Sequence, residues 1–396
     1  MSRRERASGG GQEALSELPV PPLEVLRERR SAKWRTFDAD VLPLPVAEHD
    51  FELAPPVADA LRTAVEHSDT GYAMAVPAVG EALAGFAAER WGWEPDPVRV
   101  SPVADVGVGA VELLRVLTRP GDRVVVSPPV YPPFFRWVPE AGATGVEVPL
   151  SSTDDGYRLD LAGLERAFAD ERPAVHLLCS PHNPVGRVHS PDELAALVEL
   201  ARRYDVVLVS DEIHAPLVLP GATFTPLLTV PGAAEVTIAL LSASKAFNLA
   251  GLKCAAVVSA SAGMAEVVQR MPDDLRWRVG HFGVLATVAA LTEGGEWLDR
   301  LLLTLDRRRA QLGDLLAERL PAVRWTPPEA TYLAWLDCAA LGAGDSAREA
   351  CLEQGRVAFE RGTRFGAPGD GHLRLNFGTS AEILDEAIRR MARALA

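Results

Sequence analysis

Between about residue 100 and residue 260, short runs of apolar, often β-branched residues alternate with stretches whose apolar positions recur at helical spacing. Short runs that are apolar on both faces are typical of strands buried beneath helices. The pattern therefore predicts an α/β fold with a mostly parallel sheet and helices on both of its faces. The predicted strands are 123–127, 145–150, 174–180, 206–210, 236–242 and 254–259.

Amphipathic helices are expected wherever apolar residues recur every three or four positions. One of them follows Ser190 and Pro191, which are favoured at the N-cap and at the first helical position. Another is introduced by Asp160. The helices predicted in this way are 56–67, 80–93, 161–170, 191–204 and 295–320.

The two ends of the chain have a different pattern. Four prolines between Pro43 and Pro56 argue against a long helix there, so we expect an extended segment. Beyond about residue 281, long helical stretches are followed by two strands, 330–337 and 372–377. These features predict a smaller α+β domain built from both ends. The predicted division is a disordered N-terminal arm (1–20), a small domain (21–55 and 285–396) and a large domain (56–284).

Composition and charge narrow the class of protein. With 396 residues and 48% hydrophobic content, the chain has ample material for a globular core. Lys and Arg number 40 against 54 Asp and Glu, which leaves a net charge of −14. Because an acidic surface repels phosphate backbones and anionic lipids, we expect a small-molecule substrate and neither nucleic acid nor membrane as partner.

Targeting signals and cysteines point to the cytoplasm. Arginines at the N-terminus are not followed by the apolar core of a signal peptide. The apolar stretches fall well short of the roughly 18 residues that cross a bilayer. The cysteines are far apart, without a C-x-x-C pair, so we expect neither a disulfide framework nor a metal site. They are Cys179, Cys254, Cys338 and Cys351.

Polar residues directly follow three of the predicted strands. The strand at 174–180 runs into SPHNPVGR, the strand at 206–210 into DEIH, and the strand at 236–242 into SASK. Taken singly, each could be a turn or a helix cap. Open α/β sheets, however, place their ligand sites at the carboxyl ends of the strands, so we expect these three motifs to form one site.

Lys245 and Asp211 indicate the chemistry of this site. Lys245 follows a segment apolar enough to be interior, and burial lowers the pKa of an ammonium group, which favours Schiff-base formation. Asp211 ends the preceding strand, where a cation such as a protonated pyridine ring can hold a buried carboxylate ionised. Pyridoxal phosphate chemistry requires this pair of groups. We therefore expect pyridoxal 5′-phosphate as the cofactor.

The same motifs resemble those of a known family. SPHNPVGR, SDEIH, SASKAFNLAGLK and ATYLAWLD together resemble the fold-type I pyridoxal-phosphate enzymes, specifically the C–S β-lyases of the MalY/PatB cystathionine β-lyase type. The resemblance extends from about Ser31 to the end of the chain. It implies the type I fold, with a seven-stranded, mostly parallel sheet flanked by helices and a smaller α+β domain. It also implies a homodimer that cleaves a cysteine S-conjugate.

The resemblance implies roles for several motif residues. Lys245 would bind the cofactor aldehyde as an imine and, once the substrate releases it, would shuttle the α-proton. Asp211 would pair with the pyridine nitrogen, and Asn183 would hydrogen-bond the ring oxygen O3′. Tyr131 resembles the aromatic residue that stacks on the cofactor ring, and His214 lies close to the same ring edge. The expected catalytic residues are Lys245, Asp211 and Tyr131.

Donors for the cofactor phosphate are expected where an apolar helix follows Asp105. The N–H groups of Val106 and Gly107 can meet an anion at the positive end of this helix. The hydroxyls of Ser242 and Ser244 would add further donors. The sequence thus predicts a phosphate site shared by this helix and the SASK motif.

Three further residues are assigned by the resemblance. Lys253 stands where many relatives carry a phosphate-binding arginine, and it supplies a point charge in place of a fork. Tyr72 resembles the tyrosine that reaches the phosphate across a dimer interface, so each site would need both subunits. Arg374 would bind the substrate α-carboxylate together with Asn183, because a guanidinium matches a carboxylate in bidentate geometry.

One segment departs from the family pattern, and one choice of reaction stays open. PVAEHDF stands where the family usually has a run like W-V-A-D-M-D-F, so Pro45, Glu48 and His49 replace tryptophan, aspartate and methionine. We expect this change to affect the substrate. The residues themselves do not separate a lyase from an aminotransferase, because both remove the α-proton. A cofactor-binding regulator without turnover is a third reading.

Overall fold

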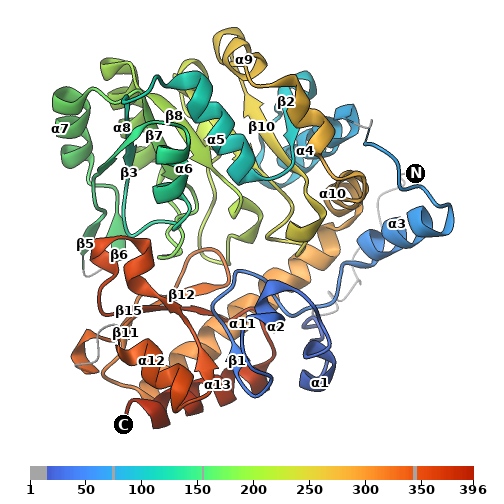
Figure 1. Ribbon diagram of the computed structural model, residues 1–396, viewed down its shortest axis with the longest axis vertical. Helices are drawn as coiled ribbons and strands as arrows, with labels where there is room; N and C mark the ends of the chain where they lie inside the picture. The colour runs from blue at the N-terminus through green and yellow to red at the C-terminus, as the bar shows by residue number, and fades with distance from the viewer. Residues whose placement is uncertain (1–15, 74–75, 154–155, 342–345) are drawn as a thin grey trace, which may run out of the picture.

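The computed structural model describes residues 16–73, 76–153, 156–341 and 346–396 (Figure 1). Its largest sheet has seven strands in the order β2-β10-β9-β8-β7-β3-β4. The five strands from β9 to β4 run parallel, whereas β10 is antiparallel to both of its neighbours. The strands are β2 (Val100–Val103), β3 (Arg123–Val126), β4 (Thr144–Glu147), β7 (Val175–Cys179), β8 (Val207–Asp211), β9 (Thr237–Leu241) and β10 (Ala255–Ser259). The predicted, mostly parallel sheet is confirmed.

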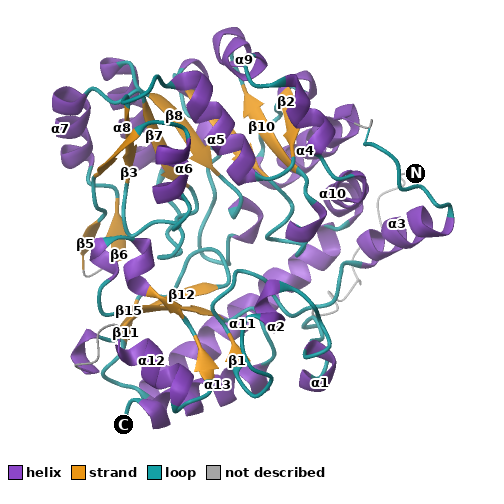
Figure 2. Ribbon diagram, viewed as in Figure 1, coloured by secondary structure: helices purple, strands orange, loops and turns teal. Residues whose placement is uncertain are grey.

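Helices cover both faces of this sheet (Figure 2). Val124 and Val126 of β3 pack on the side of α5, α6 and α9, while Val125 between them packs on the side of α7 and α8. This alternation follows from the two-residue period of a strand. The helices around the sheet are α3 (Pro55–Glu66), α4 (Val76–Trp91), α5 (Val106–Leu117), α6 (Phe134–Glu140), α7 (Leu161–Glu171), α8 (Pro191–Tyr204), α9 (Ala262–Gln269) and α10 (His281–Glu293).

A second, four-stranded antiparallel sheet lies beside the first, with the long helix α11 (Gly295–Arg319). Its strands are β11 (Arg324–Trp325), β12 (Leu333–Asp337), β15 (His372–Asn376) and β14 (Glu360–Arg361), in that order. The remaining strands pair as β1 (Leu42–Pro43) with β13 (Val357–Ala358) and β5 (Ser151–Thr153) with β6 (Gly156–Arg158). The remaining helices are α1 (Leu23–Leu26), α2 (Ala32–Arg35), α12 (Ser346–Glu353) and α13 (Ala381–Ala394).

The two ends of the chain meet in this smaller part. Strand β1 pairs in parallel with β13, more than 300 residues later. The expected disordered arm (1–20) lies outside the described residues up to residue 15, but residues 16–20 are placed against α11. There, Leu18 is buried and its N–H donates to Thr304 Oγ1 at 2.9 Å. Residues 16–20 of the predicted arm are therefore ordered, because Leu18 packs into an apolar site against α11.

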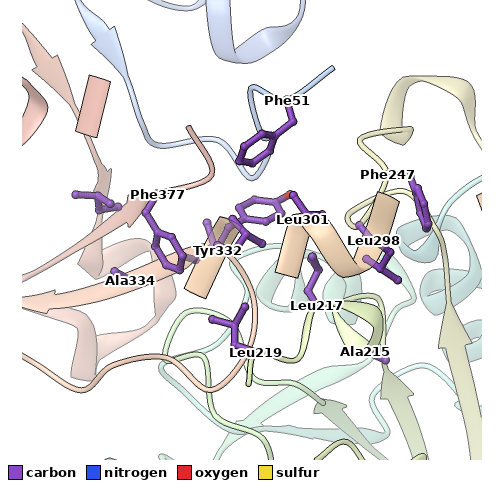
Figure 3. Close-up of a cluster of buried hydrophobic side chains, with 14 of the residues drawn as sticks. Phe51, Ala215, Leu217, Leu219, Phe247, Leu298, Leu301, Tyr332, Ala334 and Phe377 are labelled. Atoms are coloured by element: carbon purple, nitrogen blue, oxygen red, sulfur yellow. The ribbon is translucent and has the colours of Figure 1, made fainter. Parts of the chain in front are cut away.

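Buried side chains fill the space between the two sheets (Figure 3). Phe51 and Phe377 meet Tyr332 there, and Leu217 and Phe247 come from the loops that follow strands of the large sheet. All five side chains are at most 2% exposed. This packing fixes the two parts of the chain to each other where they border the cavity described below.

Three general findings concern the described residues as a set. None of their helices is long and apolar enough to span a membrane. No group of three or more histidine, cysteine, aspartate or glutamate side chains in the described ranges could hold a metal ion. The four cysteines are buried free thiols.

Candidate active site

A cavity of about 300 Å³ lies at the carboxyl ends of β7, β8 and β9, beside the start of α5. Open α/β sheets place ligand sites at this edge. The lining combines the loops that follow these strands with the N-terminus of α5. The predicted site residues on it are Val106, Gly107, Tyr131, Asn183, Asp211, His214, Ser242, Ser244, Lys245 and Lys253.

Lys245 stands in the loop after β9 and reaches across to the extended N-terminal segment. Its Nζ donates a hydrogen bond to the carbonyl oxygen of Ala47 at 3.1 Å. Burial, together with the positive charge of Arg374, lowers the pKa of Lys245 to about 8, although the carboxylates of Glu48 and Asp211 oppose this shift. A lysine in this state has a neutral, nucleophilic fraction near neutral pH.

Asp211 is the last residue of β8 and is buried at the floor of the sheet edge. Its Oδ1 accepts a hydrogen bond from the backbone N–H of Ile213 at 3.1 Å. Burial raises the pKa of Asp211 to about 7, although this hydrogen bond and the charge of Lys245 oppose the rise. A cation placed beside this carboxyl would hold it ionised.

Tyr131 and His214 add two neutral rings to the cavity wall. Tyr131 is held edge-on by Phe134 and Trp137, with ring centroids 6.2 and 5.8 Å away. Burial raises the pKa of Tyr131 to about 12, with a smaller contribution from the charge of Asp211. Burial lowers the pKa of His214 to about 3, helped by the charges of Lys245 and Arg374. Both rings are therefore uncharged near neutral pH.

Asn183 and Arg374 form a connected pair. The guanidinium of Arg374, on β15, donates from Nη1 to Asn183 Oδ1 at 3.1 Å and from Nη2 to the carbonyl oxygen of Pro45 at 2.6 Å. Since the amide oxygen of Asn183 is engaged, its amide nitrogen is the group left to donate into the cavity. Arg374 itself lies behind Asn183, is 5% exposed and has a buried Nε without a partner among the described residues.

The start of α5 offers backbone donors to an anion. Asp105 is the N-cap and accepts from the N–H of Val108 at 2.8 Å. The N–H groups of Val106 and Gly107 are at the first two helical positions, which have no partner within a helix. Gly107 leaves room for Trp137, since an added Cβ would lie 3.0 Å from its ring and the ring would have to shift by a few tenths of an ångström. The helix start is thus open to the cavity.

The remaining phosphate candidates are partly engaged with protein groups. Lys253 Nζ pairs with Asp105 Oδ2 at 2.9 Å. The hydroxyl of Ser242 donates to the carbonyl oxygen of Cys254 at 2.8 Å, so its one proton is already used, and it accepts from the N–H of Ser244 at 3.1 Å. The hydroxyl of Ser244 stays available. A phosphate here would meet one lysine that is already beside a carboxylate.

The structure places Tyr72 outside this cavity. Its side chain is 81% exposed and packs edge-on against Trp277, which is 50% exposed, with ring centroids 6.1 Å apart. The segment with Trp277 continues to Gly280, whose N–H donates to the carbonyl oxygen of Lys253 at 2.8 Å. A backbone hydrogen bond therefore links the segment that carries Trp277 to Lys253, one of the predicted phosphate-binding residues.

Sequence reasoning missed several residues on the lining, among them Ala47, Arg136, Trp137 and Cys179. Ala47 takes part through its backbone carbonyl, which has no sequence signature. Arg136 and Trp137 lie on α6, five and six residues after Tyr131, and their place in the motif SPPVYPPFFRW could have suggested them. Cys179, at the end of β7, also lines the cavity, and burial raises the pKa of its thiol well above the usual range, so it stays a thiol.

These groups fit a ligand with three features. A free helix start and a nearby lysine suit an anionic group, a buried carboxyl with its pKa raised to about 7 suits a protonated ring nitrogen, and a lysine amine suits a carbonyl carbon. Pyridoxal phosphate combines all three. The donor set, taken from the geometry alone, therefore fits this cofactor.

Comparisons with known proteins agree with this chemistry. A protein of Mycobacterium leprae is 46% identical, over 94% of this chain and 96% of its own length. The cystathionine beta-lyase of Corynebacterium glutamicum is 36% identical, over 96% of this chain and 100% of its own. Cystalysin of Treponema denticola, whose crystal structure contains pyridoxal 5′-phosphate, is 27% identical with a TM-score of 0.88, over 96% of this chain and 99% of that one. The family model for class I and II aminotransferases matches residues 39–391, so this chain belongs to that family.

Proposed function

We propose that this protein is a pyridoxal-phosphate-dependent C–S β-lyase that converts L-cystathionine, or a related cysteine S-conjugate, to a thiol, pyruvate and ammonia. The observation that carries the proposal is the cavity on which Lys245, Asp211 and Asn183 converge, with Arg374 directly behind. The lyase reaction is supported by the similarity to the C. glutamicum cystathionine beta-lyase over its whole length.

The residues around the cavity would hold the cofactor at several points. When bound, pyridoxal phosphate supplies an aldehyde that condenses with amines and a ring that accepts the electron pair of a bond broken at the α-carbon. Lys245 would bind the aldehyde carbon and Asp211 would hold the ring nitrogen protonated. The amide nitrogen of Asn183 would donate to the ring oxygen, and the start of α5 would take the phosphate.

Lys245 and Arg374 would act on the substrate. Arg374 would take the α-carboxylate through its unused N–H groups, and the Nζ of Lys245 would take the α-proton, which its lowered pKa permits near neutral pH. The electron pair left by the α-proton would form a Cα–Cβ double bond as the Cβ–S bond breaks with its own pair on sulfur, and the thiolate would leave and take up a proton. Water hydrolyses the three-carbon remainder to pyruvate and ammonia.

The working form is proposed to be a cytoplasmic homodimer. Tyr72 and Trp277 form an exposed aromatic pair, and aromatic residues are enriched in protein interfaces. The backbone hydrogen bond from Gly280 to Lys253 links the segment of this pair to a predicted phosphate-binding residue. This link supports the proposal that Tyr72 reaches the phosphate of the partner's site. Each of the two sites would then need both subunits.

An assay with and without an amino-group acceptor tests the proposed reaction. We expect the purified protein to be yellow and to release pyruvate and ammonia from L-cystathionine in equal amounts without any keto acid. The matched control is Lys245→Ala, which should lose both the visible absorption band and the turnover.

Other outcomes of this assay would support other functions. A requirement for 2-oxoglutarate or pyruvate as acceptor would make the protein an aminotransferase. Stable cofactor binding without turnover of any amino acid would favour a regulator. A protein that binds no pyridoxal phosphate would contradict the whole proposal.

A further inference from the structure

The backbone of residues 45–50 is held by side chains from distant parts of the chain. Each carbonyl oxygen from Pro45 to Asp50 accepts at least one side-chain hydrogen bond. The donors, in order along the segment, are Arg374, Asn376, Lys245 with Tyr332, Asn376 with Lys33, Asn248 and Arg29. Such a segment has little freedom to turn its carbonyl groups.

The carbonyl of Ala47 is the point where this segment meets Lys245. It accepts from the Tyr332 hydroxyl at 3.0 Å and from Lys245 Nζ at 3.1 Å. A carbonyl oxygen has two lone pairs, so these two donors complete its capacity. Tyr332 therefore helps to fix the direction of this oxygen, and the oxygen in turn holds the amine.

Tyr332 is itself held in place by burial, by a ring contact and by the backbone of the residue before it. It is fully buried, and its ring lies edge-on to His49 at 5.8 Å and 88°. The residue before it, Thr331, has a φ of +75°, which a β-branched residue rarely adopts. Its N–H donates to the carbonyl oxygen of Leu217 at 2.8 Å, and its hydroxyl accepts from the N–H of Leu333 at 3.0 Å. Such backbone conformations persist only where surrounding contacts enforce them, and they cluster at functional sites.

We propose that Tyr332 is a positioning residue for Lys245 and that the Ala47 carbonyl which it fixes is the docking point of the free lysine amine. The proposal deepens the proposed function, because it concerns the amine when it is not bound to the cofactor. A neutral amine that donates one N–H to this carbonyl keeps its lone pair for the α-proton. The resulting ammonium stays hydrogen-bonded to the same oxygen until it returns the proton.

Kinetics of the holoenzyme give the first test, with Tyr332→Phe. This change removes one oxygen and leaves the ring and its packing in place. We expect kcat to fall roughly tenfold, because small displacements of a catalytic group are costly, while KM changes less than about twofold. The isotope effect with α-deuterated substrate should rise, since proton transfer becomes the slower step. The matched control is Tyr204→Phe, whose hydroxyl donates to the side chain of Glu165 at 3.4 Å and does not line the cavity.

A titration of the lysines gives a second test that does not depend on turnover. The chain has three lysines, Lys33, Lys245 and Lys253, so the full-length protein freed of cofactor and labelled with ¹³C at lysine Cε gives three assignable signals. In Tyr332→Phe we expect the titration midpoint of Lys245 to fall, because its ammonium loses a fixed acceptor, and the other two signals serve as internal references. Ala47→Gly, which loosens the same carbonyl, should lower it too.

The two readouts separate this proposal from its alternatives. An unchanged or higher Lys245 midpoint in both variants would overturn it, since the hydroxyl would then only compete for the oxygen. A loss of kcat accompanied by an equal rise in KM would also overturn it, because a merely structural role has that effect. If no sulfur substrate is cleaved at all, the titration still decides the role of Tyr332.

Discussion

At the scale of single residues, burial drives Lys245 and Asp211 toward the same neutral state. It lowers the pKa of the amine to about 8 and raises that of the carboxyl to about 7. Near neutral pH each group is therefore close to losing its charge. A ligand that stabilises the charged form can shift the protonation equilibrium at a small cost in free energy. A protonated ring nitrogen beside Asp211 would restore the carboxylate and would use its charge for catalysis.

Asp211→Asn tests this use of charge. The amide has nearly the same shape but cannot hold a ring nitrogen protonated, so we expect kcat/KM to fall roughly 100-fold or more while the visible band persists. The control is Glu212→Gln, because burial also raises the pKa of Glu212 to about 8 but its carboxyl contacts Ser210 and Leu227 instead of the cavity. Equal losses in both variants would mean that Asp211 serves packing alone.

The sequence predicted the residues of this cavity better than their connections. Lys245, Asp211 and Asn183 stand in motifs at strand ends, so their place follows from the sheet. The Ala47 carbonyl cannot be found in this way, because every residue has one and only the fold decides where it points. The role proposed for Tyr72 differs from these, because a contact across an interface cannot be seen in a single chain.

At the scale of elements, the boundaries that follow from local chemistry were predicted well. Helix α8 spans Pro191–Tyr204 as expected, with Ser190 accepting from the N–H of Glu193 and Glu193 accepting from the N–H of Ser190. Strand β2 was missed, because it lies at the sheet edge and contains Pro102. The reversed direction of β10 was also missed, since the apolar pattern of a strand does not show which way it runs.

Ser190→Ala tests the cap of α8. The loss of the side-chain acceptor should lower the free energy of unfolding by about 1 kcal/mol, as is usual for such caps. Denaturant unfolding measures the change, and kcat should stay within twofold because α8 does not line the cavity. Ser190→Thr keeps the hydroxyl and should retain most of the stability. A full loss in the threonine variant would assign the effect to packing.

At the scale of the whole molecule, the site draws on both ends of the chain and is proposed to need a second copy. Residues 45–50, Lys245 and Arg374 come from three distant parts of the chain and are joined by hydrogen bonds. The domain division at 55–56 and 284–285 stays a prediction. Because the site joins these three parts of the chain, a fragment that contains only one of the proposed domains would lack part of it.

Mixed dimers test the proposed role of Tyr72. Lys245→Ala and Tyr72→Ala should each have little activity, but a mixed dimer would contain one site with an intact lysine and the partner's intact tyrosine. Unfolding and refolding the two variants together should therefore recover about a quarter of the wild-type activity, by random pairing of twofold dimers. No recovery from dimers that have formed would place Tyr72 outside the partner's site.

The small number of lysines also determines where reagents that react with lysine side chains can attach to this protein. Lys33 is 1% exposed in its ion pair with Asp50, and Lys245 faces the cavity. Lys253, with 54% of its side chain exposed, also lines that cavity. A dye or resin that couples to lysine side chains would therefore attach at the rim of the cavity. Attachment through a terminal tag is the route that leaves the site open.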